Sequence, residues 1–446
     1  MSRVVALIDG EHHPSVVRDA LATLGERDEV AAAVFVGGSE KVGAIAEDLY
    51  GVTLVRGEDM DSSLREALER FAPDAVVDLS DEPVVTAPDR FRLAGVALGL
   101  GVAYRGADFA FTPQERATVA TPTLAIVGTG KRVGKTALTG FLARRLTSAG
   151  KRIAVLAMGR GGPGVPVLVR GDEVLLTTAG LLEIAAAGAH AASDCYEDAL
   201  TSRVPVVGCR RCGGGLAGAT FIDDVAQGAA LADTLGADLL LIEGSGAAVP
   251  PVRADATLLV VSAAAGVSYV CDHFGPYRLA SADALIIAGA ERPNATEAEV
   301  AAIVEAVQRL RPGLPWSAVT FRPRPLADVS GARVFFATTA PAEVAVSLAR
   351  HLESESGCTV VAISPHLADR DALRSDLAEA EGRFDVLLTE LKAAAVDVVV
   401  AAGATAGVPT VFCDNEPVTV SGLDLGASLD EVVALALRRG AGRGAA

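Results

Sequence analysis

The chain of 446 residues is poor in aromatic side chains and in lysine. Only 4% of its residues are aromatic and one is tryptophan, whereas 50% are hydrophobic and 46 are glycine. The apolar mass is therefore mainly Ala, Val and Leu, a composition that suits layered α/β structure. At about three times the usual domain length, the chain is expected to fold into two or three domains.

Long hydrophobic runs, basic charge and clustered cysteines are also scarce. The longest charge-free stretches, Asp255 to Asp272 and Asp397 to Asp414, fall short of the roughly 20 apolar residues that span a membrane. The net charge of −17 argues against a surface for nucleic acid or anionic membranes. Six scattered cysteines predict reduced thiols. The apolar start before Asp9 is too short for a signal peptide, so we expect a cytoplasmic protein.

Apolar runs and helical segments alternate over the first 110 residues. The predicted strands cover residues 4–8, 31–36, 52–55, 75–79 and 101–104, and helical periodicity appears over residues 15–24 and 63–71. This pattern predicts an open parallel sheet. Because Pro113 and Pro122 interrupt the pattern, we expect an N-terminal α/β domain over residues 1–118.

The remaining chain continues the alternation in two blocks. Strands are predicted over residues 123–127, 152–158, 238–243, 256–261, 284–287 and 318–321, and then over 334–338, 359–363, 386–389, 397–401 and 410–414. The fold class is therefore α/β, with a doubly wound P-loop NTPase-type core over residues 119–325 and a C-terminal α/β extension over 326–446. The last strands either extend the core sheet or form a third, smaller unit. The Gly-rich interval 201–228 is too long for an ordinary connection and predicts an active-site loop.

A glycine-rich loop follows the strand over residues 123–127. It reads Gly128, Thr129, Gly130, Lys131, Arg132, Val133, Gly134, Lys135, Thr136, and Ala137 begins the helical run behind it. Strand, loop and helix in this order predict an ATP phosphate site, in which backbone N–H groups, Lys135 and the Thr136 hydroxyl meet the phosphates and Mg²⁺. The spacing departs from the usual form, since five residues separate Gly128 from Gly134. A tight turn without ligand is the alternative.

A second acid is needed to hold the metal or its water, usually at the end of a neighbouring strand. Glu243 ends the apolar strand over residues 238–243 and precedes a flexible Gly-Ser-Gly turn. It would therefore lie at the carboxyl edge of the sheet, where open α/β sheets bind ligands. We predict that Glu243 and Thr136 hold Mg²⁺. The alternative is an ordinary strand-end acid that faces water.

Three arginines are candidates for binding an anionic acceptor. Arg160 lies in a second Gly-rich turn after the strand over residues 152–158, and Arg210 and Arg211 have no acid close by in the sequence. In a strongly acidic chain such an island of positive charge favours a multiply anionic substrate. The alternative is a mobile surface loop whose arginines pair with distant carboxylates.

Other ionisable groups have open roles. The pair Cys209 and Cys212 forms a CxxC, but without a second such pair we do not favour a metal or redox role. At least one of Asp223 and Asp224 is expected to cap a helix beginning near residue 225. The segments at residues 9–13 and 78–82 are candidate contacts at a sheet edge. Lys392 is expected to reach the nucleotide or the acceptor, or to cover apolar surface.

Five segments in this order resemble the cyclic 2,3-diphosphoglycerate synthetase family: residues 6–12, 128–136, 157–163, 208–215 and 390–392. The loop by itself also resembles that of dethiobiotin synthetase and related P-loop ligases and ATPases. The family resemblance implies ATP-dependent closure of 2,3-diphosphoglycerate to its cyclic anhydride, with release of ADP and phosphate, by a cytoplasmic homodimer.

The residues independently suit this chemistry. Joining two phosphates in water is uphill, so we expect the ATP γ-phosphoryl group to activate one substrate phosphate before the other attacks it. Charge screening and positioning are then the requirements, and the candidate catalytic residues are Lys135, Arg160, Arg210, Arg211 and Glu243. A covalent phospho-enzyme, another ligase of the dethiobiotin synthetase type and a nucleotide-switched binding protein remain alternatives.

Overall fold

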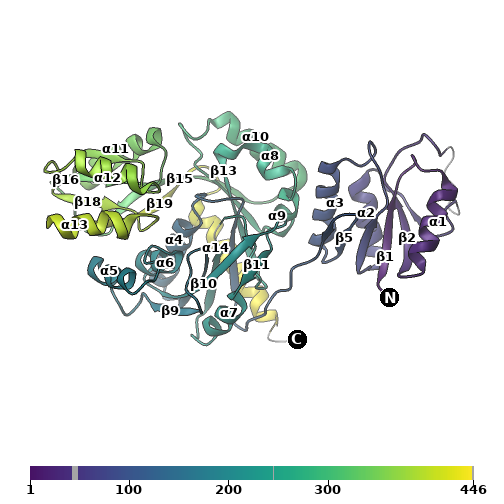
Figure 1. Cartoon of the computed structure of the whole chain (residues 1–446), viewed down its shortest axis with the longest axis horizontal. Helices are drawn as coiled ribbons and strands as arrows, with labels where there is room; N and C mark the ends of the chain where they lie inside the picture. Colours follow the sequence, from purple (N-terminus) through teal and green to yellow (C-terminus); the bar gives the residue numbers. More distant parts are fainter. Residues whose placement is uncertain (43–48, 245, 444–446) are drawn as a thin grey trace. The chain divides into compact units, whose positions relative to one another are not determined.

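The computed structural model describes residues 1–42, 49–244 and 246–443, which form two compact units (Figure 1). The first unit comprises Met1–Glu115, Val267–Ser281 and Ala306–Pro312, and the second comprises Arg116–Gly266, Ala282–Glu305 and Gly313–Ala446. The division into domains at residues 118/119 and 325/326 stays a prediction.

The first unit is built on a six-stranded sheet in the order β3-β2-β1-β4-β5-β6. Its strands are β1 (Arg3–Ile8), β2 (Glu29–Phe35), β3 (Leu54–Val55), β4 (Ala75–Asp78), β5 (Ala103–Arg105) and β6 (Ala110–Phe111). Its helices include α1 (Pro14–Gly25), α2 (Met60–Phe71) and α3 (Ala87–Gly99). All strand pairs are parallel except β5 with β6. The predicted open parallel sheet is therefore confirmed.

The second unit is built on a sheet of 13 strands. They are β7 (Thr123–Gly128), β8 (Ile153–Gly159), β9 (Val167–Arg170), β10 (Pro205–Gly214), β11 (Thr220–Asp223), β12 (Leu239–Gly244), β13 (Ala256–Ser262), β14 (Ala284–Ala288), β15 (Trp316–Pro325), β16 (Arg333–Ala337), β17 (Thr359–Ser364), β18 (Val386–Thr389) and β19 (Thr410–Gly422). The order is β11-β10-β8-β12-β7-β13-β14-β15-β19-β18-β16-β17, and β9 pairs with β10.

The later helices alternate with these strands along the chain, except that α14 follows β19, and residues 267–281 with most of α8 and all of α9 belong to the first unit. They are α4 (Lys135–Ser148), α5 (Thr178–Ala186), α6 (Asp194–Ser202), α7 (Val225–Asp233), α8 (Gly266–Cys271), α9 (Gly275–Ser281), α10 (Glu297–Leu310), α11 (Ala342–Ser356), α12 (Arg370–Glu379), α13 (Ala401–Ala406) and α14 (Leu425–Arg443). The short 3-10 turn Ala263–Ala265 precedes α8, and the π-helical segment Ala395–Val400 precedes α13.

A long antiparallel ribbon joins the core sheet to the C-terminal strands. β15 pairs in parallel with β14 at its start and runs antiparallel to β19 from Ser317 to Pro325. The first residues of β19 pair in parallel with β18. The C-terminal strands therefore extend the core sheet, as one of the two alternatives from the sequence predicted.

Two of the sequence-based expectations are wrong. Residues 201–228 do not form one long loop, because β10 and β11 build an antiparallel hairpin there and α7 begins at Val225. Residues 397–401 are helical, although the run of valines suggested a strand. A short apolar run is equally compatible with a buried helical segment, and Val398 and Val399 are indeed buried.

The core of the second unit lies between the central strands and the helices that cover them. Leu124, Ile126 and Leu258 of the sheet are fully buried, or nearly so, in one cluster that also contains Leu138 of α4 and Val433 of α14. The C-terminal helix α14, drawn in yellow in Figure 1, thus returns to pack on the core. This packing fixes the sheet whose carboxyl edge carries the phosphate loop.

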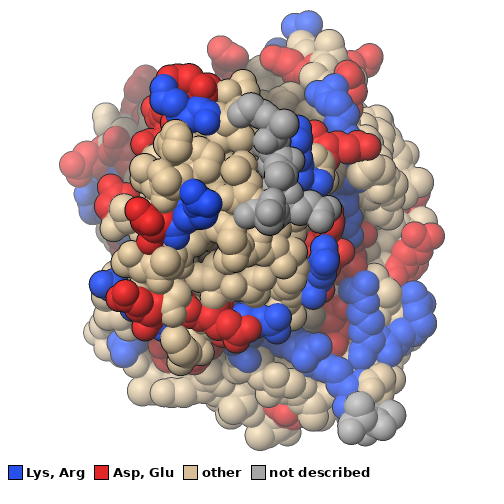
Figure 2. All heavy atoms as spheres, turned by 90° about the vertical axis from the view of Figure 1, so that its right-hand side faces the viewer, with Lys and Arg blue, Asp and Glu red and all other residues tan. Residues whose placement is uncertain are grey.

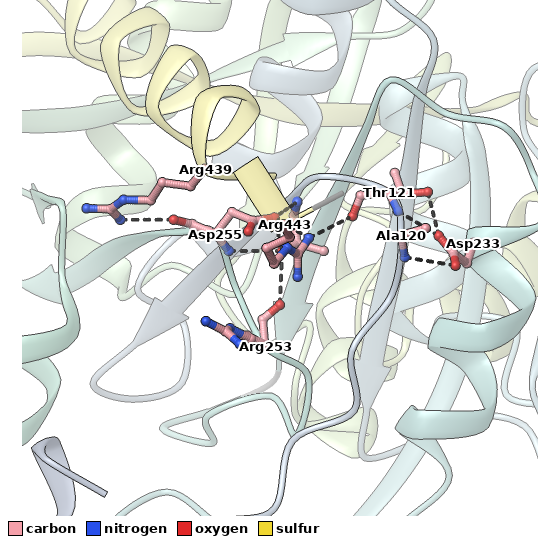
Figure 3. Close-up of polar contacts among 8 residues, drawn as sticks. Ala120, Thr121, Asp233, Arg253, Asp255, Arg439 and Arg443 are labelled. Carbon is pink, nitrogen blue, oxygen red and sulfur yellow. Dashed lines mark hydrogen bonds and ion pairs between the residues drawn. The ribbon is translucent and has the colours of Figure 1, made fainter. Parts of the chain in front are cut away.

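Carboxylates at the opposite, amino-terminal edge of the core sheet hold chain segments that are distant in sequence (Figure 3). Asp255 is 5% exposed and accepts hydrogen bonds from the Thr123 backbone N–H at 2.8 Å and from Arg443 Nη2 at 2.7 Å. Asp233 accepts from the backbone N–H groups of Ala120 and Thr121 at 3.0 and 2.8 Å. These contacts tie the end of α14 and the segment before β7 to the sheet.

The surface shows mixed charge on the face drawn in Figure 2. Lys and Arg side chains are interspersed there with Asp and Glu, which differs from the single-sign surface typical of nucleic-acid binding. Among the helices of the described ranges, none has the length and apolar character needed to cross a membrane.

We predict that Asp255→Ala lowers the free energy of unfolding by about 3 kcal/mol, because it leaves Arg443 and the Thr123 N–H without their buried acceptor. Denaturant unfolding monitored by circular dichroism measures the change. Asp238→Ala is the matched control, since its ion pair with Arg152 is exposed and the loss should stay below about 1 kcal/mol. Equal losses in the two variants would contradict the role of Asp255.

Candidate functional site

The phosphate loop connects β7 to α4 at the carboxyl edge of the core sheet. All six residues of β7 are buried, and α4 begins at Lys135. Arg132 and Gly134 have positive φ angles of 57° and 91°. A side chain at Gly134 would also collide with the Phe321 ring. Such left-handed residues turn backbone N–H groups into a concave anion site at the positive end of a helix.

Lys135 is held inside this loop and is only 6% exposed. Its Nζ donates to the backbone carbonyls of Gly130 and Gly246, each at 3.0 Å. A Cβ on Gly128 would lie 2.8 Å from that Nζ, so glycine is needed there for the lysine to pass. Burial lowers the pKa of Lys135, although the Glu243 carboxylate opposes the shift. The two carbonyl oxygens carry only partial negative charge, so a bound phosphate would be a stronger anionic partner for Lys135.

Glu243 lies beside the loop because β12 pairs in parallel with both β7 and β8. The Thr136 hydroxyl donates to Glu243 Oε2 at 3.4 Å, whereas the buried Oε1 has no hydrogen-bond partner. Burial, followed by the charge of Asp194, raises the pKa of Glu243 to about 8. A buried carboxylate oxygen without a partner, next to a hydroxyl, fits a Mg²⁺ ion that takes its remaining ligands from phosphates and water.

The described part of the chain contains no group of three or more His, Cys, Asp or Glu side chains that could hold a metal ion. Thr136 and Glu243 would supply only part of a Mg²⁺ coordination shell, so a metal in this loop would depend on the bound nucleotide for most of its ligands. This dependence is usual for Mg²⁺, which binds proteins through one or two carboxylates together with substrate phosphates.

The start of α6 brings three acids to the site that the sequence analysis missed. Glu197 and Asp198 are 7% and 0% exposed, and Asp194 is half-buried with its Oδ2 atom inside the protein. Asp194 Oδ2 and both carboxylate oxygens of Asp198 have no hydrogen-bond partner. Burial raises the pKa of all three, that of Glu197 to about 7. Glu197 and Asp198 follow Asp194 by three and four residues, a spacing that places them near Asp194 on one face of a helix. This spacing is the sequence signal from which the three acids could have been predicted.

A cationic wall faces these acids. Arg160 follows β8. Its charge is the main cause that lowers the pKa of Lys131, which indicates that the two side chains lie close together. Arg211 contributes to the same shift, and its Nη2 lies 3.1 Å from the point where a Cβ on Gly246 would stand. Three cations thus gather around the loop that holds Lys135.

Arg210 and Arg211 point in different directions, because successive side chains of a strand alternate between its faces. Arg210 Nε lies 3.8 Å from Asp224 Oδ2, and the Arg210 side chain is 53% exposed. The expectation that Arg210 has no acid nearby is therefore wrong. Asp224 lies beside Arg210 in space only because β10 and β11 form a hairpin, where the sequence predicts a loop.

A cavity of about 660 Å³ opens between the phosphate loop and the C-terminal strands. Lys131, Arg132, Val133, Gly134, Lys135, Thr136 and Ala137 line it, together with Arg160 and Glu243. Gly128, Thr129, Gly130, Arg210 and Arg211 are not among its lining residues. The far wall includes Thr339, Glu390 and Lys392, which follow β16 and β18. Two carboxyl sheet edges therefore meet at one cavity.

Other candidates from the sequence have structural roles. Asp9 is buried and accepts hydrogen bonds from the backbone N–H groups of Glu11 and Asp81 at 2.8 and 2.6 Å, as turn chemistry requires. Asp224 is the N-cap residue of α7 but its side chain makes no capping hydrogen bond, whereas Asp223 Oδ1 accepts from the Val225 N–H at 3.1 Å.

The CxxC pair does not form a joint site in the fold. Cys209 is buried and Cys212 is exposed, and both are free thiols.

The fold and this cavity define a P-loop nucleotide-binding protein of the α/β class. Models of the cyclic 2,3-diphosphoglycerate synthetase N-terminal domain, P-loop domain and C-terminal domain match residues 3–112, 123–318 and 325–416. The chain belongs to the cyclic 2,3-diphosphoglycerate synthetase family.

Curated relatives named cyclic 2,3-diphosphoglycerate synthetase match almost the whole chain. The protein from Rubrobacter xylanophilus is 48% identical over 99% of this chain and 98% of its own length. The protein from Thermococcus kodakarensis is 44% identical over 96% of this chain and 98% of its own length. Among solved structures, LpxK from Aquifex aeolicus in complex with ATP covers 72% of this chain and 90% of its own, with 14% identity and a TM-score of 0.40. A likeness this weak supports no functional inference.

The raised pKa of Glu243 predicts pH-dependent binding of a divalent cation. Below about pH 8 this carboxyl group holds a proton that a metal must displace, so the apparent Mg²⁺ affinity in the presence of ADP should fall as the pH decreases from 8 to 6. The expected change is up to about tenfold per pH unit. Calorimetric titration at three pH values measures it, with ADP alone as the control. The same affinity at each pH would contradict a metal contact by Glu243.

Proposed function

We propose that the protein catalyses ATP-dependent formation of the intramolecular phosphoanhydride of 2,3-diphosphoglycerate, with release of ADP and phosphate. One observation carries the proposal: the phosphate loop, Arg160 and Lys392 line a single cavity large enough for a nucleotide and a small acceptor. Seven of the described side chains that line this cavity are Lys or Arg and five are Asp or Glu, in a chain whose net charge is −17. An acceptor with several negative charges suits such a lining.

The reaction has two phosphoryl steps. A substrate phosphate attacks the γ-phosphorus of ATP, and ADP leaves. The second substrate phosphate then attacks the inner phosphorus of the new diphosphate, the ring closes, and inorganic phosphate leaves. No protein nucleophile is required, so positioning and charge stabilisation are the tasks of the side chains.

The residues around the loop suit these tasks. The loop N–H groups and Lys135 would bind the β- and γ-phosphates, and Arg160 would orient the acceptor phosphate from the neighbouring strand end. Thr136 and Glu243 would hold Mg²⁺, which when bound supplies charge neutralisation for the transferred group. Arg211 would screen the same region from the side of Gly246, whereas Arg210 is farther from the chemistry because it faces Asp224.

Two other parts of the proposal rest on the family resemblance alone. We propose that the enzyme acts as a homodimer and in the cytoplasm. Sedimentation equilibrium of the purified protein tests the first, and fractionation of the source cells tests the second.

The decisive experiment follows ADP release and ³¹P NMR of the purified protein with Mg-ATP, with and without 2,3-diphosphoglycerate. The proposal requires acceptor-dependent ADP release together with new upfield signals of the pyrophosphate type. ADP release without the acceptor would favour a nucleotide-switched binding protein. No turnover with this acceptor would favour a ligase with another substrate, such as one of the dethiobiotin synthetase type.

Lys135→Ala should lower acceptor-dependent ADP release by at least about 100-fold, because the phosphates lose their buried counter-charge. The fold should remain intact, since the Lys135 Nζ contacts are to two backbone carbonyls. Turnover measured by a coupled ADP assay, with circular dichroism as the folding control, checks both points. Wild-type turnover in a folded variant would refute the phosphate-site assignment.

Arg211→Ala should raise the KM for 2,3-diphosphoglycerate roughly tenfold or more, while Arg210→Ala should change it less than about threefold. The reason is that Arg211 lies beside Gly246, whose carbonyl accepts from Lys135, whereas Arg210 faces Asp224. The two variants are matched controls for each other, because they remove the same side chain from adjacent positions. Steady-state kinetics at saturating ATP measure the difference, and a larger effect of Arg210→Ala would reverse this assignment.

A further inference from the structure

The far wall of the cavity carries a lysine that the proposed reaction does not yet use. Lys392 follows β18, and Thr339 follows the neighbouring parallel strand β16. Both residues line the cavity opposite the phosphate loop. Since ligands of parallel sheets bind beyond the carboxyl ends of the strands, this second edge is a natural place for an acceptor contact.

The Lys392 ammonium group is held in position by Glu197, and the charge of Glu390 lies near it. Its Nζ lies 3.0 Å from Oε1 of Glu197 on α6. Glu390, two residues before it, is itself fixed by the Thr339 N–H at 3.1 Å, the Thr339 hydroxyl at 2.8 Å and Asn415 Nδ2 at 2.6 Å. The lysine is therefore oriented before any ligand arrives, which lowers the entropic cost of binding.

The Lys392 side chain is more exposed to solvent than that of its acidic partner Glu197. The Lys392 side chain is 30% exposed, whereas the side chain of Glu197 is 9% exposed. An ammonium group has three N–H donors, and the contact with Glu197 occupies one of them. Lys392 thus keeps donor capacity on the side that faces the cavity.

Lys392 and the cations of the phosphate loop line the same cavity. Lys135 and Arg160 lie on the side of the loop, and Lys392 lies on the far wall. Asp194 also lines this cavity, and its pKa is raised by burial and lowered by the charges of Lys135, Arg160 and Lys392. A molecule with two phosphates and a carboxylate could contact the loop and the far wall at once.

We propose that Lys392 binds an anionic group of the acceptor and so holds the acceptor against the phosphate loop. This inference rests on the proposed function and extends its binding site to the C-terminal strands. Glu197 is then a positioning residue that holds Lys392 until the acceptor arrives. The alternative role is a structural ion pair between α6 and the loop after β18, which would affect stability alone.

Single and double variants separate these roles. Lys392→Met should raise the KM for 2,3-diphosphoglycerate roughly 10- to 100-fold and leave the Kd of Mg-ATP within about twofold, as expected for loss of a charged hydrogen bond to the acceptor. Glu197→Gln keeps a hydrogen-bond acceptor for Lys392 but removes the charge that positions it, so it should raise this KM by less than about threefold. The double variant Glu197→Gln with Lys392→Met removes both charges, so it should recover thermal stability and keep the raised KM. Lys151→Met, outside the cavity lining, is the matched control.

The results distinguish this inference from the proposed function. Wild-type turnover tests the reaction, and calorimetric titration of 2,3-diphosphoglycerate in the presence of Mg-ADP tests the Lys392 contact even where turnover is absent. A KM and an acceptor Kd that both stay at wild-type values in the double variant would overturn the inference, whatever the stability change. A matching KM increase in Glu197→Gln would also overturn it. If Lys392→Met alone does not fold, the double variant and Lys392→Arg, which should regain part of the affinity, decide the question.

Discussion

The site depends on the burial of one cation, Lys135, between two backbone carbonyls at the start of α4. Removing an ammonium group from water is costly, and the surrounding chain offsets this cost with the carbonyls of Gly130 and Gly246 and the nearby charge of Glu243. Gly130 follows the end of β7, Glu243 lies near the end of β12, and Gly246 follows the end of β12. The register of β7, β8 and β12 is therefore a precondition for the phosphate site.

The same low-dielectric environment explains the state of the acids around the lysine. Glu243, Asp194 and Asp198 each have a buried carboxylate oxygen without a hydrogen-bond partner. Burial raises the pKa of each, which favours their protonated forms. A bound cation would replace those protons. The structure thus links occupancy of the phosphate site to the charge state of acids on α6 and β12.

The C-terminal strands do more than enlarge the sheet. Through the ribbon of β15 and β19 they turn a second carboxyl edge toward the cavity, where Thr339, Glu390 and Lys392 lie opposite the loop. Meanwhile α14 returns to the core and is held at the opposite edge by Asp255. The chain thus returns to the core sheet after the strands that carry the far wall.

The sequence by itself determined the local features of this protein. Apolar runs predicted most strands, and the order of strand, glycine loop and Gly-Lys-Thr predicted the phosphate site, because both depend on neighbouring residues. Prediction from the sequence failed where partners are distant along the chain, as for the hairpin that brings Asp224 to Arg210 and for the acids of α6 beside Glu243. It also failed for residues 397–401, which are helical. Only the tertiary structure decided which charges meet, since long-range strand pairing, and not spacing along the chain, sets those distances.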